Sequence, residues 1–154
     1  MNGGNYATTT NFIYDSLGNV GIGTTDPQTK ADIRGTASAE TITEGASTYV
    51  NSGAAYTIPD SSLSVRRIDL TANSTITLPA YTSTVARIYT LTIFLRQDAT
   101  GSRTVTWAGA GNTIKWDAGV APTISATASK ITIIQLTKVS DESVWYGSLV
   151  WKED

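Results

Sequence analysis

Hydrophobic and polar residues alternate in short segments along most of the chain, and no segment follows the 3.6-residue period of a helix. Such alternation is typical of β-strands, because successive side chains point to opposite faces of a sheet. Gly, Pro, Asn and Asp separate the segments and mark turns. The pattern predicts strands over residues 20–22, 40–43, 47–50, 55–58, 65–70, 75–78, 87–96, 103–107, 114–116, 130–138 and 144–151.

The two longest apolar segments also indicate which side chains share a face. In residues 87–96, the alternation directs one set of side chains toward a core: Tyr89, Leu91, Ile93 and Leu95. In residues 144–151, it puts Trp145, Leu149 and Trp151 on one face and Val144, Tyr146 and Val150 on the other. This is too much apolar surface for a strand that faces water, so we expect a neighbouring subunit to cover part of it.

Composition supports an all-β protein with a weakly charged surface. Only 16% of residues are charged and 40% are hydrophobic, and strand-favouring Thr, Val, Ile, Tyr and Trp are abundant. We expect a β-sandwich or jelly-roll-like domain, preceded by an extended N-terminal arm with short strands. The expected organisation is an arm and trimerising segment over residues 1–35, a linker with weak strands over 36–64, and the β-sandwich domain over 65–154.

The residue composition excludes most catalytic and metal-binding sites. The chain has no His and no Cys, so it lacks the parts of a Ser-His-Asp triad, a Cys-His pair or a zinc site. Asp98, with Thr100 and Gly101, supplies one carboxylate where calcium needs several, which favours a hairpin turn. A net charge of −2 without a basic stripe argues against nucleic-acid binding, and no apolar run could span a membrane. We expect no enzyme activity, no cofactor and no metal.

The segment Gly18–Pro27 reads GNVGIGTTDP and follows a stretch rich in Asn, Gly and Thr. It resembles segments of the form GNVGIGTTxP, followed by a stretch such as Lys30–Ile33, in tail fibres and other surface appendages of tailed bacteriophages. A dinucleotide-binding loop is a poor alternative, because Asp26 stands where that motif needs its third glycine. The resemblance implies a virion protein, in which the glycines would let three chains approach a shared axis.

A second resemblance runs from Leu70 to the C-terminus. The order of several short stretches resembles a β-sandwich module of phage structural proteins: residues 73–79, 91–101, 103–107, 114–116, 121–123 and 145–147. Proteins of that group are virion surface components and are generally trimeric, which implies a homotrimer. The resemblance carries over no catalytic residue.

Two functions fit these expectations. The first, favoured by the short chain, is a capsid decoration or cement protein that its arm holds to the major capsid protein or another virion protein. The alternative is a receptor-binding module of a tail fibre, which contacts host surface glycans through the loops 108–112 and 117–122. In both cases the protein is made in the host cytoplasm and lies on the virion surface as a homotrimer.

Candidate contact residues follow from the apolar anchors. The candidate trimer or docking contacts are Tyr6, Phe12, Tyr14, Val20, Ile22 and Trp151. The candidate glycan contacts are Trp107 and Trp116, because an aromatic face complements the apolar side of a pyranose ring. Packing in the core or at a trimer interface is the alternative for both tryptophans, since large aromatic side chains are mostly buried.

Overall fold

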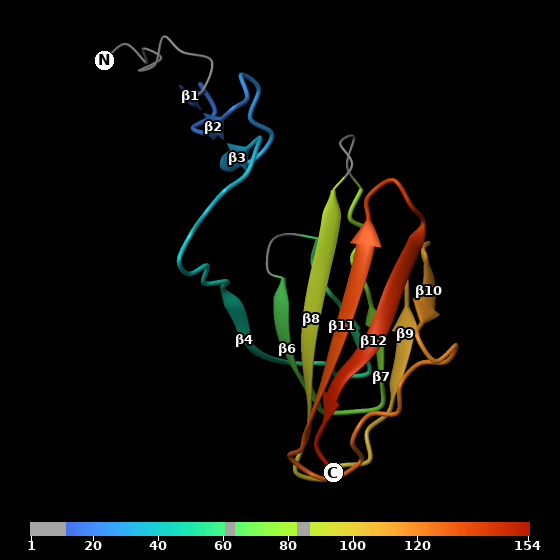
Figure 1. The fold of residues 1–154 in the computed structure, drawn as a ribbon. Coiled ribbons are helices and arrows are strands. Elements are labelled where there is room, and N and C mark those ends of the chain that lie inside the picture. Colours follow the sequence, from blue (N-terminus) through green and yellow to red (C-terminus); the bar gives the residue numbers. More distant parts are fainter. Residues whose placement is uncertain (1–11, 61–63, 83–86) are drawn as a thin grey trace. The chain divides into compact units, whose positions relative to one another are not determined.

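The computed structural model describes residues 12–60, 64–82 and 87–154 of the chain (Figure 1). The predicted contact Tyr6 therefore lies outside the described residues. All regular secondary structure in these ranges is β-strand, which confirms the all-β prediction. No helix in the same ranges is long and apolar enough to cross a membrane. The chain divides into two compact units between Ile42 and Thr43.

The N-terminal unit contains a small three-stranded sheet. Its strands lie in the order β1 (Phe12–Tyr14), β2 (Val20–Ile22) and β3 (Ala31–Ile33). β1 and β2 are antiparallel, whereas β2 and β3 are parallel. The predicted strand at residues 20–22 is confirmed, and the stretch expected to be an extended arm forms a sheet.

A side-chain hydrogen-bond network fixes the turn between β1 and β2. Oδ1 of Asp15 accepts the backbone N–H groups of Leu17 (2.9 Å) and Asn19 (2.8 Å). Gly18 has a φ of +75°, a conformation that glycine adopts without steric cost. These bonds lower the pKa of the Asp15 carboxyl, chiefly through the Asn19 amide. The turn therefore follows from residues that the sequence places next to one another.

The C-terminal unit contains two sheets. The six-stranded sheet has the order β10-β12-β11-β8-β6-β4, and the three-stranded sheet has the order β5-β7-β9. The strands are β4 (Ala46–Asn51), β5 (Ala55–Thr57), β6 (Val65–Leu70), β7 (Ser74–Thr77), β8 (Ile88–Gln97), β9 (Val105–Ala108), β10 (Thr113–Trp116), β11 (Ile131–Val139) and β12 (Val144–Lys152).

From β4 to β9 the chain alternates between the two sheets. In the larger sheet β4, β6 and β8 pair in parallel, and in the smaller sheet β5, β7 and β9 do the same. The chain thus winds around a shared interior, and each turn of the winding adds one strand to each sheet. β8, β11 and β12 then pair in antiparallel order, and β10 adds to β12 in parallel. This pairing differs from a jelly roll, whose strands are antiparallel throughout.

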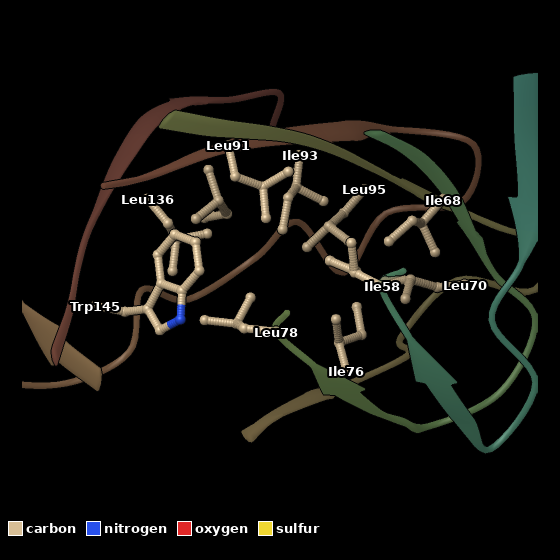
Figure 2. Packing of buried hydrophobic residues seen from close by; sticks show 11 residues of the cluster. Ile58, Ile68, Leu70, Ile76, Leu78, Leu91, Ile93, Leu95, Leu136 and Trp145 are labelled. Atoms are coloured by element: carbon tan, nitrogen blue, oxygen red, sulfur yellow. The ribbon is translucent and has the colours of Figure 1, made fainter. Parts of the chain in front are cut away.

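The core is one cluster of aliphatic side chains and Trp145, drawn from both sheets (Figure 2). The larger sheet supplies Ile68, Leu70, Leu91, Ile93, Leu95, Ile134, Leu136 and Trp145, and the smaller sheet and its flanks supply Ile58, Ile76 and Leu78. Each of these side chains is at most 1% exposed. Burial of a side chain of this size contributes about 1.5–3 kcal/mol, so this cluster is the main source of stability.

The predicted faces of β8 are confirmed. The face predicted for Trp151 on β12 is wrong. Leu91, Ile93 and Leu95 are buried in the core. On β12, Leu149 pairs with Ile134, whereas Trp151 pairs with the neighbouring Ile133, so one extra residue is inserted between them. Such a bulge changes the phase of the alternation and turns Trp151 to the outer face of the sheet.

Two further differences concern residues 36–64. The described structure has no strand at residues 40–43, while β4 and β5 pair into the sheets of the C-terminal unit. The compact C-terminal unit therefore begins at Thr43, ahead of the expected domain start at residue 65. Strands at residues 47–50 and 55–58 are predicted from the sequence, but their small polar residues alternate only weakly, which favoured a linker over a part of the domain.

A buried lysine closes the turn between β11 and β12. Lys138 is 1% exposed, and its Nζ donates to the carbonyl groups of Val139 (3.1 Å), Ser140 (3.5 Å) and Glu142 (2.5 Å). A charged group of this kind is tolerated in the interior when it is hydrogen-bonded. These bonds tie the turn to the strand that precedes it.

Replacement of Ile93 by alanine should test the shared core. Ile93 is fully buried at the centre of β8, so Ile93→Ala should lower the free energy of unfolding by about 2–5 kcal/mol. Ile88→Ala, in the same strand but at a side chain 73% exposed, should change it by less than about 0.5 kcal/mol. Urea denaturation at one protein concentration measures both. Equal losses in the two variants would contradict this core.

Candidate functional site

The two candidate glycan contacts, Trp107 and Trp116, come from different sheets and lie together. Trp107 is on β9, at the edge of the three-stranded sheet, and Trp116 is on β10, at the edge of the six-stranded sheet. Their ring centroids are 5.5 Å apart and their planes are inclined by 59°. Edge strands of both sheets thus bring together residues that are nine positions apart in the sequence.

The indole rings border a surface hollow of about 460 Å³, called here the tryptophan hollow. It is lined by Val105, Thr106, Trp107, Gly109, Asn112, Ile114, Trp116 and Ala121. Both indoles are partly buried and also pack against the core cluster. The two interpretations of these tryptophans are therefore compatible, since one ring can pack against the core on one side and line the hollow on the other.

A tight turn between β9 and β10 forms one wall of the hollow. The Asn112 backbone N–H and its Nδ2 both donate to the Gly109 carbonyl, each at 2.9 Å. Ala110 and Gly111 have φ angles of +48° and +86°. A positive φ at alanine is uncommon and marks a backbone held by its surroundings. The predicted loop 108–112 thus lies at the hollow, and Ala121 brings in the second predicted loop.

Gly147 provides the room that Trp116 occupies. Trp116 and Gly147 are paired in register on β10 and β12. A Cβ added at Gly147 would overlap the six-membered ring of the Trp116 indole. The pattern of residues along the chain does not indicate this role of Gly147, although Gly147 lies in one of the stretches that carry the second resemblance.

The charged groups of the Asp98 turn pair with one another inside the turn. The Asp98 carboxylate accepts hydrogen bonds from Nε and Nη2 of Arg103 (3.0 and 2.8 Å) and from the amides of Thr100 and Gly101. The pKa of the Asp98 carboxyl is lowered, chiefly by the hydrogen bond from the Arg103 guanidinium. The hydrogen-bond partners of the Asp98 carboxylate lie within the turn itself, which agrees with the prediction of a hairpin turn. In the described ranges, no cluster of three or more acidic residues could hold a metal ion.

In the N-terminal unit, the described candidate contacts share one face of the small sheet. Phe12 pairs with Ile22, which pairs with Ile33, and Tyr14 pairs with Val20. The exposed fractions are 45% for Phe12, 54% for Tyr14, 43% for Ile22 and 47% for Ile33. We call Phe12, Tyr14, Val20, Ile22 and Ile33 the N-terminal apolar face.

The opposite face of this small sheet is closed by the unit's own chain. Gly21 is buried there, and a Cβ added to it would lie 2.7 Å from the Thr24 carbonyl oxygen. Asp32 is 6% exposed and accepts from the Gln28 N–H and from Arg34. The close approach that Gly21 permits is thus to Thr24 of the same chain, while the apolar face stays open.

Trp151 lies in a row that crosses the outer face of the six-stranded sheet. The strand registers align Tyr49, Arg67, Phe94, Ile133 and Trp151 on five neighbouring strands. The Arg67 and Arg96 guanidinium carbons lie 4.2 and 3.9 Å from the centroid of the Tyr49 ring. Arg96 also makes two hydrogen bonds with Asp69, at 2.6 and 2.7 Å. Trp151 is 48% exposed at the end of this row.

Gly147→Ala should displace the Trp116 indole. Because the new methyl group has no room, we expect a change in the near-UV circular dichroism and a loss of about 1–3 kcal/mol in the free energy of unfolding. Ser148→Ala, at the next residue, is the control and should leave the spectrum unchanged. A Gly147→Ala variant with the spectrum and stability of the unchanged protein would contradict this contact.

The Asp98 turn should be sensitive to acid. A carboxyl whose pKa is lowered in the folded state stabilises the fold above its ordinary pKa, and this stabilisation is lost as the pH falls through the lowered value. The free energy of unfolding of the unchanged protein should therefore exceed that of Asp98→Asn at pH 7, and the gap should narrow below about pH 4. Urea titrations from pH 7 to pH 3 measure the gap. A gap independent of pH would contradict the ion pair.

Comparisons with known proteins identify the family. Residues 56–141 match a family described as "Putative phage tail fibre C-terminal domain". Searches of curated proteins and of solved structures found no match. The family description supports the tail-fibre alternative of the sequence analysis and gives no support to the preferred capsid decoration or cement role. Since the match covers more than half of the chain and includes the tryptophan hollow, the chain belongs to the family of phage tail fibre C-terminal domains.

Proposed function

We propose that this chain is a non-enzymatic structural module of the phage tail fibre, exposed on the virion surface as a homotrimer. The observation that carries the proposal is the N-terminal apolar face, defined above. Its large side chains are about half exposed on one side of a sheet whose other side is closed. A surface of this kind, gathered on one face, marks a site of association.

The size of the N-terminal unit supports association with further copies of the same chain. None of the fully buried core side chains lies in residues 12–42. Units below about 40 residues usually need disulfides, a metal or oligomerisation to be stable. The chain has no Cys and no His, so oligomerisation is the route its composition favours. Three copies is the number that the resemblance of Gly18–Pro27 to fibre segments implies.

For the C-terminal unit we propose a two-layer β-sandwich whose outer face contributes to the same trimer. The core shared by the two sheets supports the sandwich. The row from Tyr49 to Trp151, in which Arg67 stands among aromatic and aliphatic side chains, supports contact with a neighbouring copy. Tail components are the partners that we expect beyond the trimer itself.

A test of the trimer is native mass spectrometry of the full chain at micromolar concentration. The unchanged protein should appear at three times the chain mass of 16.3 kDa. Ile22→Asp puts a charge in the N-terminal apolar face and should shift the population toward monomers, because burial of an unpaired charge is costly. Ile42→Asp is a matched control, since Ile42 is 79% exposed and lies outside the strands.

Two results would overturn this assembly. A monomeric unchanged protein would contradict the trimer as a whole. A trimer that withstands Ile22→Asp as well as it withstands Ile42→Asp would contradict the role of the N-terminal apolar face.

A second candidate function is recognition of host surface glycans by the C-terminal unit. The tryptophan hollow favours it, because two indoles at an open depression are suited to stacking on sugar rings. A glycan array probed with the full chain tests this function. Binding to a defined set of sugars is the expected result, and an array without bound sugars would overturn it.

A further inference from the structure

The tryptophan hollow continues into a second hollow. The second has a volume of about 340 Å³ and is lined by Ser102, Arg103, Thr104, Val105, Ala121, Pro122, Thr123, Ile124 and Ala126. Val105 and Ala121 line both. The two hollows therefore adjoin, and we call the pair the β9 groove, since Val105 of β9 lines both. Each part lies within the range of about 300–1,000 Å³ that is usual for small-molecule sites.

The groove follows the edge of β9. Val105, Thr106 and Trp107, three consecutive residues of the strand, line the first hollow. Because successive side chains of a strand point to opposite faces, consecutive residues meet one hollow only at the strand's edge. β9 ends the three-stranded sheet in the described structure, and the backbone of an edge strand offers hydrogen-bonding groups.

The lining changes in character from one end to the other. The first hollow offers the indoles of Trp107 and Trp116, and the second offers the apolar side chains of Pro122 and Ile124. Polar groups accompany each part. The Asn112 side chain donates through Nδ2 to Gly109, which leaves Oδ1 for a hydroxyl donor. Thr104 and Thr123 supply hydroxyl groups at the other end.

The groove provides no free charge. Arg103 is the one charged residue among the lining residues of the two hollows, and its guanidinium is engaged by Asp98 at 2.8 Å. A sugar acid or a phosphorylated sugar would lose water from its anion without gaining a free cation, which is unfavourable. The chemistry of the lining thus suits a ligand with apolar faces and hydroxyl groups but no net charge.

We propose that the β9 groove binds an uncharged oligosaccharide of at least two pyranose rings. One ring stacks on the Trp107 and Trp116 indoles, and the next lies past Val105 and Ala121 in the second hollow. This inference rests on the proposed glycan recognition and adds the class of sugar and the residues that select it. Selection against anionic sugars follows from the pairing of Arg103.

The experiment uses the full chain and a panel of immobilised glycans with soluble competitors. The panel contains neutral oligosaccharides, their sialylated counterparts and the constituent monosaccharides. We expect binding to neutral oligosaccharides, at least about tenfold weaker binding to monosaccharides, and little change between 50 and 500 mM NaCl, because no ion pair contributes. Tryptophan fluorescence should change on binding.

Variants locate the site. Trp107→Ala should abolish binding but removes a side chain that also packs against the core. Ala121→Glu therefore provides the decisive test, because Ala121 is exposed where the two hollows meet and glutamate would add bulk and charge there. We expect at least about a tenfold loss of affinity. Ala54→Glu, at an exposed residue that lines neither hollow and lies outside the loops 108–112 and 117–122, should bind normally.

The outcomes separate this inference from the function on which it rests. Binding confined to sialylated sugars would overturn the uncharged ligand but leave glycan recognition standing. Binding to neutral sugars that Ala121→Glu does not weaken would overturn the β9 groove as the site. Binding to monosaccharides as strong as to oligosaccharides would overturn the need for two rings. A complete lack of glycan binding would overturn the receptor function itself.

Discussion

The fold of the C-terminal unit depends on one layer of aliphatic side chains that both sheets must share. The chain passes from one sheet to the other at every strand from β4 to β9, so each strand has only one side on which to contribute to that layer. Leu91, Ile93 and Leu95 at the centre of β8 meet Ile76 and Leu78 from the opposite sheet in this layer (Figure 2). Close packing in such a thin core leaves little freedom for the strands to shift in register.

The candidate binding surface arises where this layer reaches its edge. At the margin formed by β9 and β10, tryptophans replace the aliphatic residues, and each has one side against the core and another at the surface. Because Gly147 has no side chain, the Trp116 indole can lie directly against its backbone. The surface is therefore positioned by the same packing that stabilises the unit.

Much of the fold could be predicted because alternation reports directly on burial. The bounds of β6 and the faces of β8 follow from the sequence, since Leu91, Ile93 and Leu95 leave no other face for the core. Hydrophobic and polar side chains alternate in the same way in parallel and antiparallel strands. The pattern therefore could not predict that β4 to β9 pair in parallel within each sheet. The bulge that turns Trp151 outward was likewise hidden, because one extra residue changes the phase without changing composition. The sequence indicated Trp107 and Trp116 as candidate glycan contacts. Their contact with each other could not be predicted, because it depends on which strands form the edges of the two sheets.

The pairing of β10 with β12 has a consequence for how the protein is made. β10 covers residues 113–116, yet its partner in the sheet covers residues 144–152. A chain leaves the ribosome N-terminus first, so the earlier windings can form while β10 still waits for its partner. The sheet can therefore hold Trp116 in register only after residues 144–147 have been synthesised, so the position of this indole depends on a strand that comes later in the chain.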